Sequence, residues 1–172
     1  MEDLLILIDE ILNEHKTIQQ RIKNLEDIAN DAEAIAGFEK ASEDFKPGRF
    51  DQSQGLKKLR KMLNKISRGL EAHFNHEETN LLSAFKRYGA PDLASNLGFI
   101  LLEHEDIRNR LEHAKQYMTE LNTGGLSRHL WEASANDMRA HLSQTRRLIE
   151  VHVETERKLL QTLRKQLKNS QK

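Results

Sequence analysis

The segment His73-Phe74-Asn75-His76-Glu77-Glu78 contains the spacing His-x-x-x-Glu, formed by His73 and Glu77. Residues four apart in a helix lie on one face, one turn above the other, so this imidazole and this carboxylate would point at the same place. The same spacing returns in the segment HVETE, as His152 and Glu156. One such pair is ordinary on a helix surface. Two pairs in the same apolar phase indicate a common role.

Apolar residues recur at alternating spacings of three and four along most of the chain, which is typical of helices packed in a bundle. We expect helices at about residues 3–36, 53–88, 91–121 and 126–167. The His/Glu pairs fall in the apolar seams of the second and fourth of these helices. His15 and His104 occupy seam positions of the first and third, where Leu or Ile would be usual. The longest connection, residues 37–53, contains the turn signal Lys46-Pro47-Gly48 and is the one candidate for a lid or crossing loop.

The two halves of the chain resemble each other. Residues 14–22 (EHKTIQQRI) match residues 103–111 (EHEDIRNRL), with Glu, His, Ile and Arg in register. Each half therefore consists of one helix with a His and one helix with a His/Glu pair. We predict an all-α fold, an up-down-up-down four-helix bundle made of a duplicated helical hairpin, with residues 1–172 as a single domain.

Composition excludes several classes of protein. Lys+Arg 27 balances Asp+Glu 27, and this net charge of +0 argues against a dedicated nucleic-acid binder. The chain has no Cys, which excludes disulfides, Cys-ligated clusters and a thiol nucleophile. No apolar run approaches the ~20 residues of a membrane span, and the first residues lack the basic segment of a signal peptide. We expect a soluble cytoplasmic protein without a nucleic-acid or membrane partner.

The polar residues of the seams lie at similar depths along their helices. At a rise of 1.5 Å per residue, all of them are about 15–22 Å from one end of the bundle, so an up-down-up-down arrangement brings them into one layer. Burying each ionised carboxylate unpaired would cost on the order of several kcal/mol, so a partner must compensate. The residues of this layer are His15, His73, Glu77, His104, His152 and Glu156.

Four imidazoles and two carboxylates are a suitable ligand set for one or two transition-metal ions, because imidazole binds Fe, Zn, Cu and Ni and mixed N/O sets suit Fe(II). If each Glu bridges two ions and each ion takes two His, every ion has four protein ligands and room for a small ligand. The alternative is a metal-free bundle in which buried His and Glu pair across the core. We favour the metal site because the six residues share a layer and the set is duplicated.

Residues beside this layer are further candidates. Glu14, Glu78 and Glu103 could accept the second N–H of ligand imidazoles, or they could be solvated charges on the flanks of the helices. His76 lies at the edge of the seam, either as a fifth ligand or as a rim residue, and we favour the rim.

The order His, His-x-x-x-Glu, His, His-x-x-x-Glu over four helices resembles the hemerythrin-like family, specifically its HHE cation-binding branch. The resemblance covers roughly residues 10–165. It implies two Fe ions bridged by oxo or hydroxo groups and carboxylates, with Zn or Ni as substitutes. The implied terminal imidazole ligands are His15, His73, His104 and His152, and the implied bridging carboxylates are Glu77 and Glu156.

Two positions depart from the oxygen-carrying hemerythrins. Those proteins have a second His one turn after the third-helix His, where this chain has Arg108. Their last helix ends the motif with an Asp one residue later, where this chain has Arg157 after Glu156. The ligand set is closer to that of relatives linked to nitrosative stress and iron–sulfur cluster repair. Their Cys-bearing segment has no counterpart here, so repair chemistry is not carried over.

Three functions follow as hypotheses. The first is a di-iron protein that binds, senses or detoxifies a small ligand (O2, NO or peroxide) or holds labile iron, for instance in a stress response. The second is a di-iron oxidase or a peroxide- or NO-consuming enzyme that uses the same open positions. The third is a structural bundle without metal.

Overall fold

A computed structural model describes residues 2–29, 54–88, 91–122 and 126–169. The first helix is α1 (Glu2–Ala29), and the second rod consists of α3 (Gln54–His76), a π-helical turn η2 (Glu77–Leu81) and α4 (Leu82–Tyr88). The remaining helices are α5 (Pro91–Asn122) and α6 (Arg128–Asn169). The predicted all-α fold class and four-helix bundle are confirmed.

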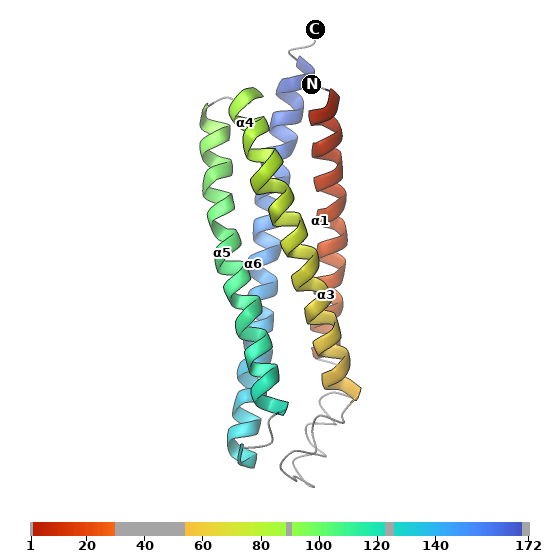
Figure 1. Cartoon of the computed structure of the whole chain (residues 1–172), viewed down its shortest axis with the longest axis vertical. Coiled ribbons are helices and arrows are strands. Elements are labelled where there is room, and N and C mark those ends of the chain that lie inside the picture. The colour runs from red at the N-terminus through yellow and green to blue at the C-terminus, as the bar shows by residue number, and fades with distance from the viewer. Residues whose placement is uncertain (1, 30–53, 89–90, 123–125, 170–172) are drawn as a thin grey trace.

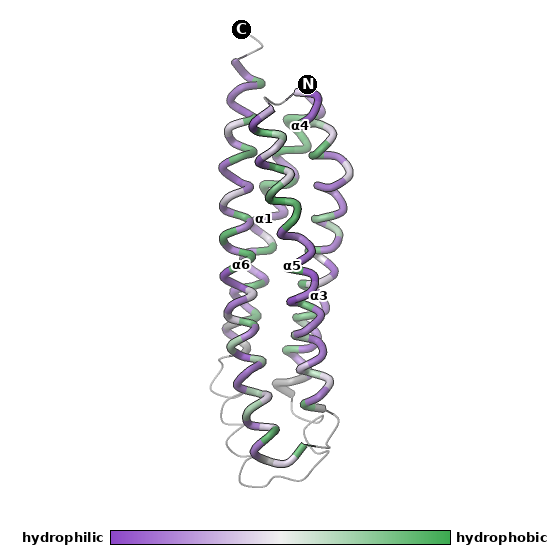
Figure 2. Tube along the Cα trace, turned by 90° about the vertical axis from the view of Figure 1, so that its left-hand side faces the viewer, coloured by the Kyte–Doolittle hydropathy of each residue, from purple (hydrophilic) through white to green (hydrophobic). Residues whose placement is uncertain are grey.

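The rods stand side by side along the long axis of the molecule, and both chain ends lie at the same end of the bundle (Figure 1). The principal contacts of α1 are with α3 and α6, and those of α5 are also with α3 and α6. The order around the bundle is therefore α1, α3, α5, α6. Hydrophobic and hydrophilic residues alternate along each helix (Figure 2), as expected for helices that each bury one face.

Buried apolar side chains form two clusters. We call one the terminal cluster, because it lies toward the chain ends, and the other the distal cluster. The terminal cluster contains Leu4, Ile8, Ile11, Leu81, Phe85, Leu97, Ile100, Leu159, Leu160, Leu163 and Leu167. The distal cluster includes Ile18, Leu63, Leu70, Phe74, Ile107, Leu111, Met138, Ile149 and Val153. His15, Glu77, His104 and Glu156 fall between the members of the two clusters along their rods, and His73 and His152 lie one residue before the distal members Phe74 and Val153. The polar layer therefore lies where the two clusters meet.

The second rod is not the uninterrupted α-helix that the sequence predicted. The N–H of Leu82 donates to the carbonyl of Glu77, five residues earlier, which is the hydrogen bond of a π-turn. The cause is visible in the spacing of the seam: His73, Glu77, Leu81 and Phe85 follow one another in three steps of four. Such steps exceed the 3.6-residue period, and one wide turn restores the phase. Burial therefore falls on Phe85, which is 0% exposed, and not on its neighbour Ala84, which is only partly buried.

The start of α6 also differs from the prediction. Alternating spacing would place Leu130 and Ala133 in the seam, but both are exposed, whereas Trp131 and Ala135 are buried. The indole N–H of Trp131 donates to the carbonyl of Leu121 at 3.2 Å, and burial of this large side chain fixes the phase of the helix start. Ser127 precedes the helix, and its Oγ accepts the N–H of Leu130 at 3.5 Å, which is the contact of an N-cap serine.

Two predicted segments lie in parts of the chain that the structure does not describe. The connection at residues 37–53 and the last residues of the predicted first helix, 30–36, lie outside the described residues. None of the helices in the described ranges combines the length and apolar character needed to cross a lipid bilayer.

Candidate metal centre

The structure brings all six residues of the polar layer together. Each is at most 2% exposed, although each is polar or charged. The helix period explains this, because every one of them takes the place of an apolar residue in its seam. Each rod contributes: α1 supplies His15, α3 and its π-turn supply His73 and Glu77, α5 supplies His104, and α6 supplies His152 and Glu156.

Four of these residues converge on one point, which we call the first position: His15, His73, Glu77 and Glu156. His15 Nε2 lies 3.1 Å from His73 Nε2 and 3.2 Å from Glu156 Oε2. Glu77 Oε1 lies 2.8 Å from His73 Nε2 and 3.5 Å from His15 Nε2. The donor atoms of two imidazoles and two carboxylates thus face one another.

A second position is formed by Glu77, His104 and His152. Glu77 belongs to both positions, because its Oε1 faces the first and its Oε2 lies 3.3 Å from His104 Nε2. Glu156 Oε2 is 3.8 Å from His152 Nε2, farther than it is from His15. Glu77 is therefore placed to span the two positions, and Glu156 lies nearer the first.

The spacing of these donor atoms fits a bound transition-metal ion. Ligand atoms about 2.0–2.2 Å from such an ion, at angles of roughly 90–110°, lie about 2.8–3.6 Å apart. The four separations at the first position, 2.8–3.5 Å, fall in that range. An ion would thus make bonds to these residues without requiring them to move far.

The polar layer also contains buried polar atoms for which no described residue offers a partner with hydrogen-bond geometry, although oxygens of Glu77 and Glu156 lie within 3.5 Å of an imidazole nitrogen. They include both oxygens of Glu77, both oxygens of Glu156, and the Nε2 atoms of His104 and His152. Leaving such an atom unpaired costs about 1–3 kcal/mol. All of them face the interior of the layer, so a cation bound there would satisfy them together.

Three carboxylates orient the imidazoles from outside. His73 Nδ1 lies 2.7 Å from Glu14, His104 Nδ1 lies 2.8 Å from Glu78, and His152 Nδ1 lies 2.9 Å from Glu103. An ionised carboxylate only accepts, so each Nδ1 carries the proton and donates it. The lone pair of each Nε2 is then directed into the layer, as in metal-binding histidines. The three acidic residues singled out beside the motif thus contact imidazoles of the layer.

Charges within the layer shift the pKa values of its own groups. Burial lowers the pKa of His15, but the neighbouring carboxylates of Glu156 and Glu77 outweigh it and raise that pKa to about 9. Burial and the charge of Glu77 raise the pKa of Glu156 to about 7. Burial also acts to raise the pKa of Glu77, yet the surrounding imidazoles hold it well below its usual range. Without a metal ion, His15 is therefore protonated and Glu77 ionised at neutral pH, and a cation must displace the proton of His15.

His76 lies outside both positions. Its side chain is 26% exposed, and its Nδ1 is 3.5 Å from Glu14 Oε1. The rim interpretation of the sequence fits this location.

Sequence reasoning missed two residues that hold His104. The ring of Phe74 stacks on the His104 imidazole, with centroids 3.9 Å apart and planes 15° apart. Arg108 donates to Glu78 at 3.0 Å and to Glu71 at 2.9 Å, which fixes the carboxylate that accepts from His104. Phe74 could have been found, since it lies four residues after the buried Leu70 and so falls in the seam beside His73.

Comparison with known proteins gives one family match. The model of the hemerythrin family, described as the hemerythrin HHE cation binding domain, matches residues 6–164. No curated protein and no solved structure matches the chain.

Proposed function

The chain belongs to the hemerythrin family of HHE cation-binding domains, and from this premise we propose that it is a non-haem di-iron protein. Its function would be to bind, sense or detoxify a small ligand such as O2, NO or peroxide, or to hold labile iron. The observation that carries the proposal is the buried polar layer, in which six donor residues from all four rods surround two adjoining positions.

We assign the residues of the polar layer to two ion positions. His15 and His73 would hold an ion at the first position, His104 and His152 one at the second, and Glu77 would serve both. Ions such as Fe(II), bound by imidazole and carboxylate with open coordination positions, supply reversible binding and redox chemistry toward small molecules. The apolar clusters on either side of the layer exclude bulk water.

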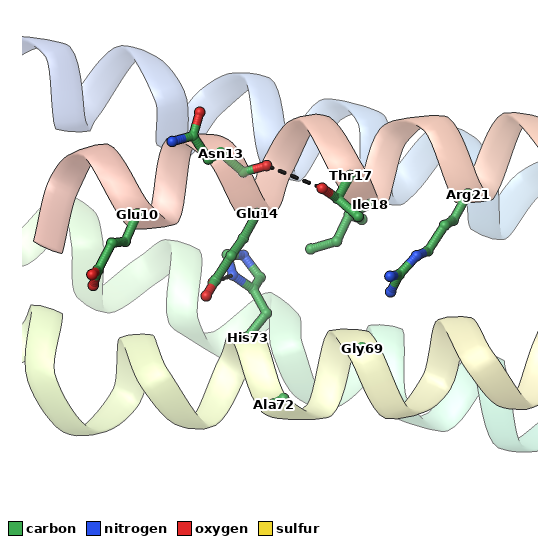
Figure 3. Close-up of a pocket in the computed structure, with 9 residues that line it drawn as sticks. All are labelled: Glu10, Asn13, Glu14, Thr17, Ile18, Arg21, Gly69, Ala72 and His73. Carbon is green, nitrogen blue, oxygen red and sulfur yellow. Dashed lines mark hydrogen bonds and ion pairs between the residues drawn. The ribbon is translucent and has the colours of Figure 1, made fainter.

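A specific observation keeps an enzymatic function as a second candidate. A groove of about 470 Å³ runs between α1 and α3, and His73 and Glu14 are among its lining residues (Figure 3). A small molecule could reach the edge of the polar layer there, as a di-iron oxidase or a peroxide- or NO-consuming enzyme requires. Consumption of peroxide or NO beyond one equivalent per centre would favour the enzyme, and stoichiometric binding would favour a protein that binds or senses the ligand.

Anaerobic loading with Fe(II) followed by removal of free metal tests the proposal. We expect about two iron ions per chain and a visible absorption band after exposure to air. Replacing His73 and His152 together by Ala should abolish iron binding while helix content survives. The matched control replaces His113 and His129, two exposed histidines of α5 and α6, and should keep both ions. A colourless wild-type protein without iron would favour the metal-free bundle.

A further inference from the structure

We propose that His15 is the weakest of the four imidazole ligands, because this chain gives it no orienting carboxylate. The inference rests on the proposed function, since it assigns unequal roles within the same centre. His15 differs from the other three histidines of the layer in what its Nδ1 atom contacts.

The Nδ1 atom of His15 is buried and has no hydrogen-bond partner among the described residues. The other three histidines each have a carboxylate oxygen within 2.7–2.9 Å of Nδ1. A neutral imidazole that binds a metal through Nε2 must carry its proton on Nδ1. For His15 that N–H would remain buried and unpaired, whereas for the others a carboxylate accepts it and makes the imidazole a stronger ligand.

The internal repeat shows which residue leaves the Nδ1 of His15 without an acceptor. Glu14 and Glu103 occupy matching places in the two halves and contact His73 and His152 in matching ways. Glu78, which follows Glu77 and accepts from His104, corresponds to the residue after Glu156. That residue is Arg157, a donor that cannot accept a hydrogen bond from His15.

Arg157 is turned away from the layer. Its guanidinium contacts Glu154 through Nε at 2.9 Å and through a terminal nitrogen at 2.7 Å. The helix α6 also has no π-turn at Glu156, whereas η2 begins at Glu77. The second rod thus directs two successive carboxylates toward the centre, and the fourth rod directs one.

His104, the counterpart of His15, is held on several sides. Besides Glu78, it has the stacked ring of Phe74, and Arg108 fixes Glu78 in place. The residue that corresponds to Phe74 in the second half is Val153, which offers no ring to His15. The ring that His15 does meet is that of His73, edge to face, with centroids 4.8 Å apart.

Competition of Co(II) binding against a coloured chelator tests the inference on the matched pair His15→Ala and His104→Ala. We expect His104→Ala to weaken Co(II) binding at least tenfold more than His15→Ala, the range in which orienting partners act. Equal losses, or a greater loss from His15→Ala, would overturn the inference. Far-ultraviolet circular dichroism confirms that both variants are folded.

A second comparison repeats the two His replacements after a carboxylate outside the polar layer has been removed. In a Glu78→Ala background His104 loses its acceptor, so replacing His104 should then cost no more than replacing His15. The control Glu71→Ala removes the other carboxylate that binds Arg108 but none that touches an imidazole, and should preserve the difference. An unchanged difference in the Glu78→Ala background would overturn the inference. Wild-type protein that binds no Co(II) would instead overturn the proposed function, and this inference with it.

Discussion

Glu77 is the residue on which both positions of the centre depend. Its two oxygens face different positions, and imidazoles from α1, α3 and α5 surround it. It is 0% exposed, so its charge is balanced by these neighbours and not by water. Glu156 is equally buried but lies nearer the first position, because its Oε2 is 3.2 Å from His15 Nε2 and 3.8 Å from His152 Nε2.

We therefore predict different losses from two isosteric substitutions. Glu77→Gln should reduce bound Co(II) below one ion per chain, because both positions lose a carboxylate. Glu156→Gln should retain about one ion, held at the second position by His104, His152 and Glu77. Metal analysis after removal of free ion measures the difference, and a greater loss from Glu156→Gln would contradict the assignment.

The pKa of His15 predicts how the metal-free protein responds to pH. A histidine whose pKa is raised from 6.5 to about 9 on folding contributes stability that is complete below pH 6.5 and lost as the pH rises through about 9. The raised pKa of Glu156 acts in the same direction but at lower pH, because its contribution is complete below pH 4.5 and lost as the pH rises through about 7. The free energy of unfolding in urea with a chelator present should fall by on the order of 1–3 kcal/mol between pH 6.5 and pH 9.5.

The matched variant for this measurement is His15→Gln. In this variant most of the decline in the free energy of unfolding between pH 6.5 and pH 9.5 should disappear. Cation binding has the opposite dependence, because the ion displaces the proton of His15. Its affinity should rise over the same pH interval, and a decline in affinity would contradict the assignment of His15 as a ligand.

At the scale of an element, the π-turn η2 is the feature that sets the second rod apart. Between His73 and Phe85 the second rod contains one residue more than the regular α-helical spacing of buried positions, and the π-turn accommodates this extra residue. Both carboxylates at the start of the π-turn contact the centre, because Glu77 lies in the polar layer and Glu78 accepts from His104. The corresponding stretch of α6 is a continuous α-helix.

Deleting Asn80, an exposed residue of the π-turn, should therefore be tolerated. The seam would then run through His73, Glu77, Leu81 and Phe85 with steps of four, three and four, the regular pattern of an α-helix. Deleting Asn64, an exposed residue of the same type in α3, should destabilise the protein severely. Every buried residue on one side of that deletion would turn by ~100° relative to the other side. Urea unfolding of both deletion variants measures the contrast, and equal destabilisation would contradict it.

At the scale of the whole molecule, the bundle and its polar layer follow from the sequence. Seam spacing predicts four helices, and depth along each helix predicts that six residues meet, because both depend only on the helix period and rise. The exposure of Leu130 and the burial of Trp131 could not be predicted, because the hydrogen bond from the Trp131 indole to the carbonyl of Leu121 decides which face the start of α6 buries. The π-turn was missed because the expected periodicity was regular. The contact of Arg108 with Glu78 was missed because it joins two different rods. The spacing of residues along each helix does not specify how the two rods are rotated relative to each other.

Metal should stabilise the whole bundle, because the layer joins all four rods. An ion that binds only the folded chain adds about 2.7 kcal/mol at a free concentration one hundred times its Kd. The Tm of the Co(II)-loaded protein should exceed that of the chelated protein by several degrees. The variant with His73 and His152 both replaced by Ala should show no such shift, and a shift equal to that of the wild type would place the ion elsewhere.

The polar layer between the terminal and distal clusters has a consequence for how the chain assembles. Helices that meet only through hydrocarbon can slide past one another by one turn, about 5.4 Å, and still bury apolar surface. In this chain such a displacement would push Glu77 or Glu156 into Leu and Ile side chains, away from every imidazole. The layer therefore favours one axial alignment of the four rods, and we expect misaligned hairpins to be less stable even before an ion is bound.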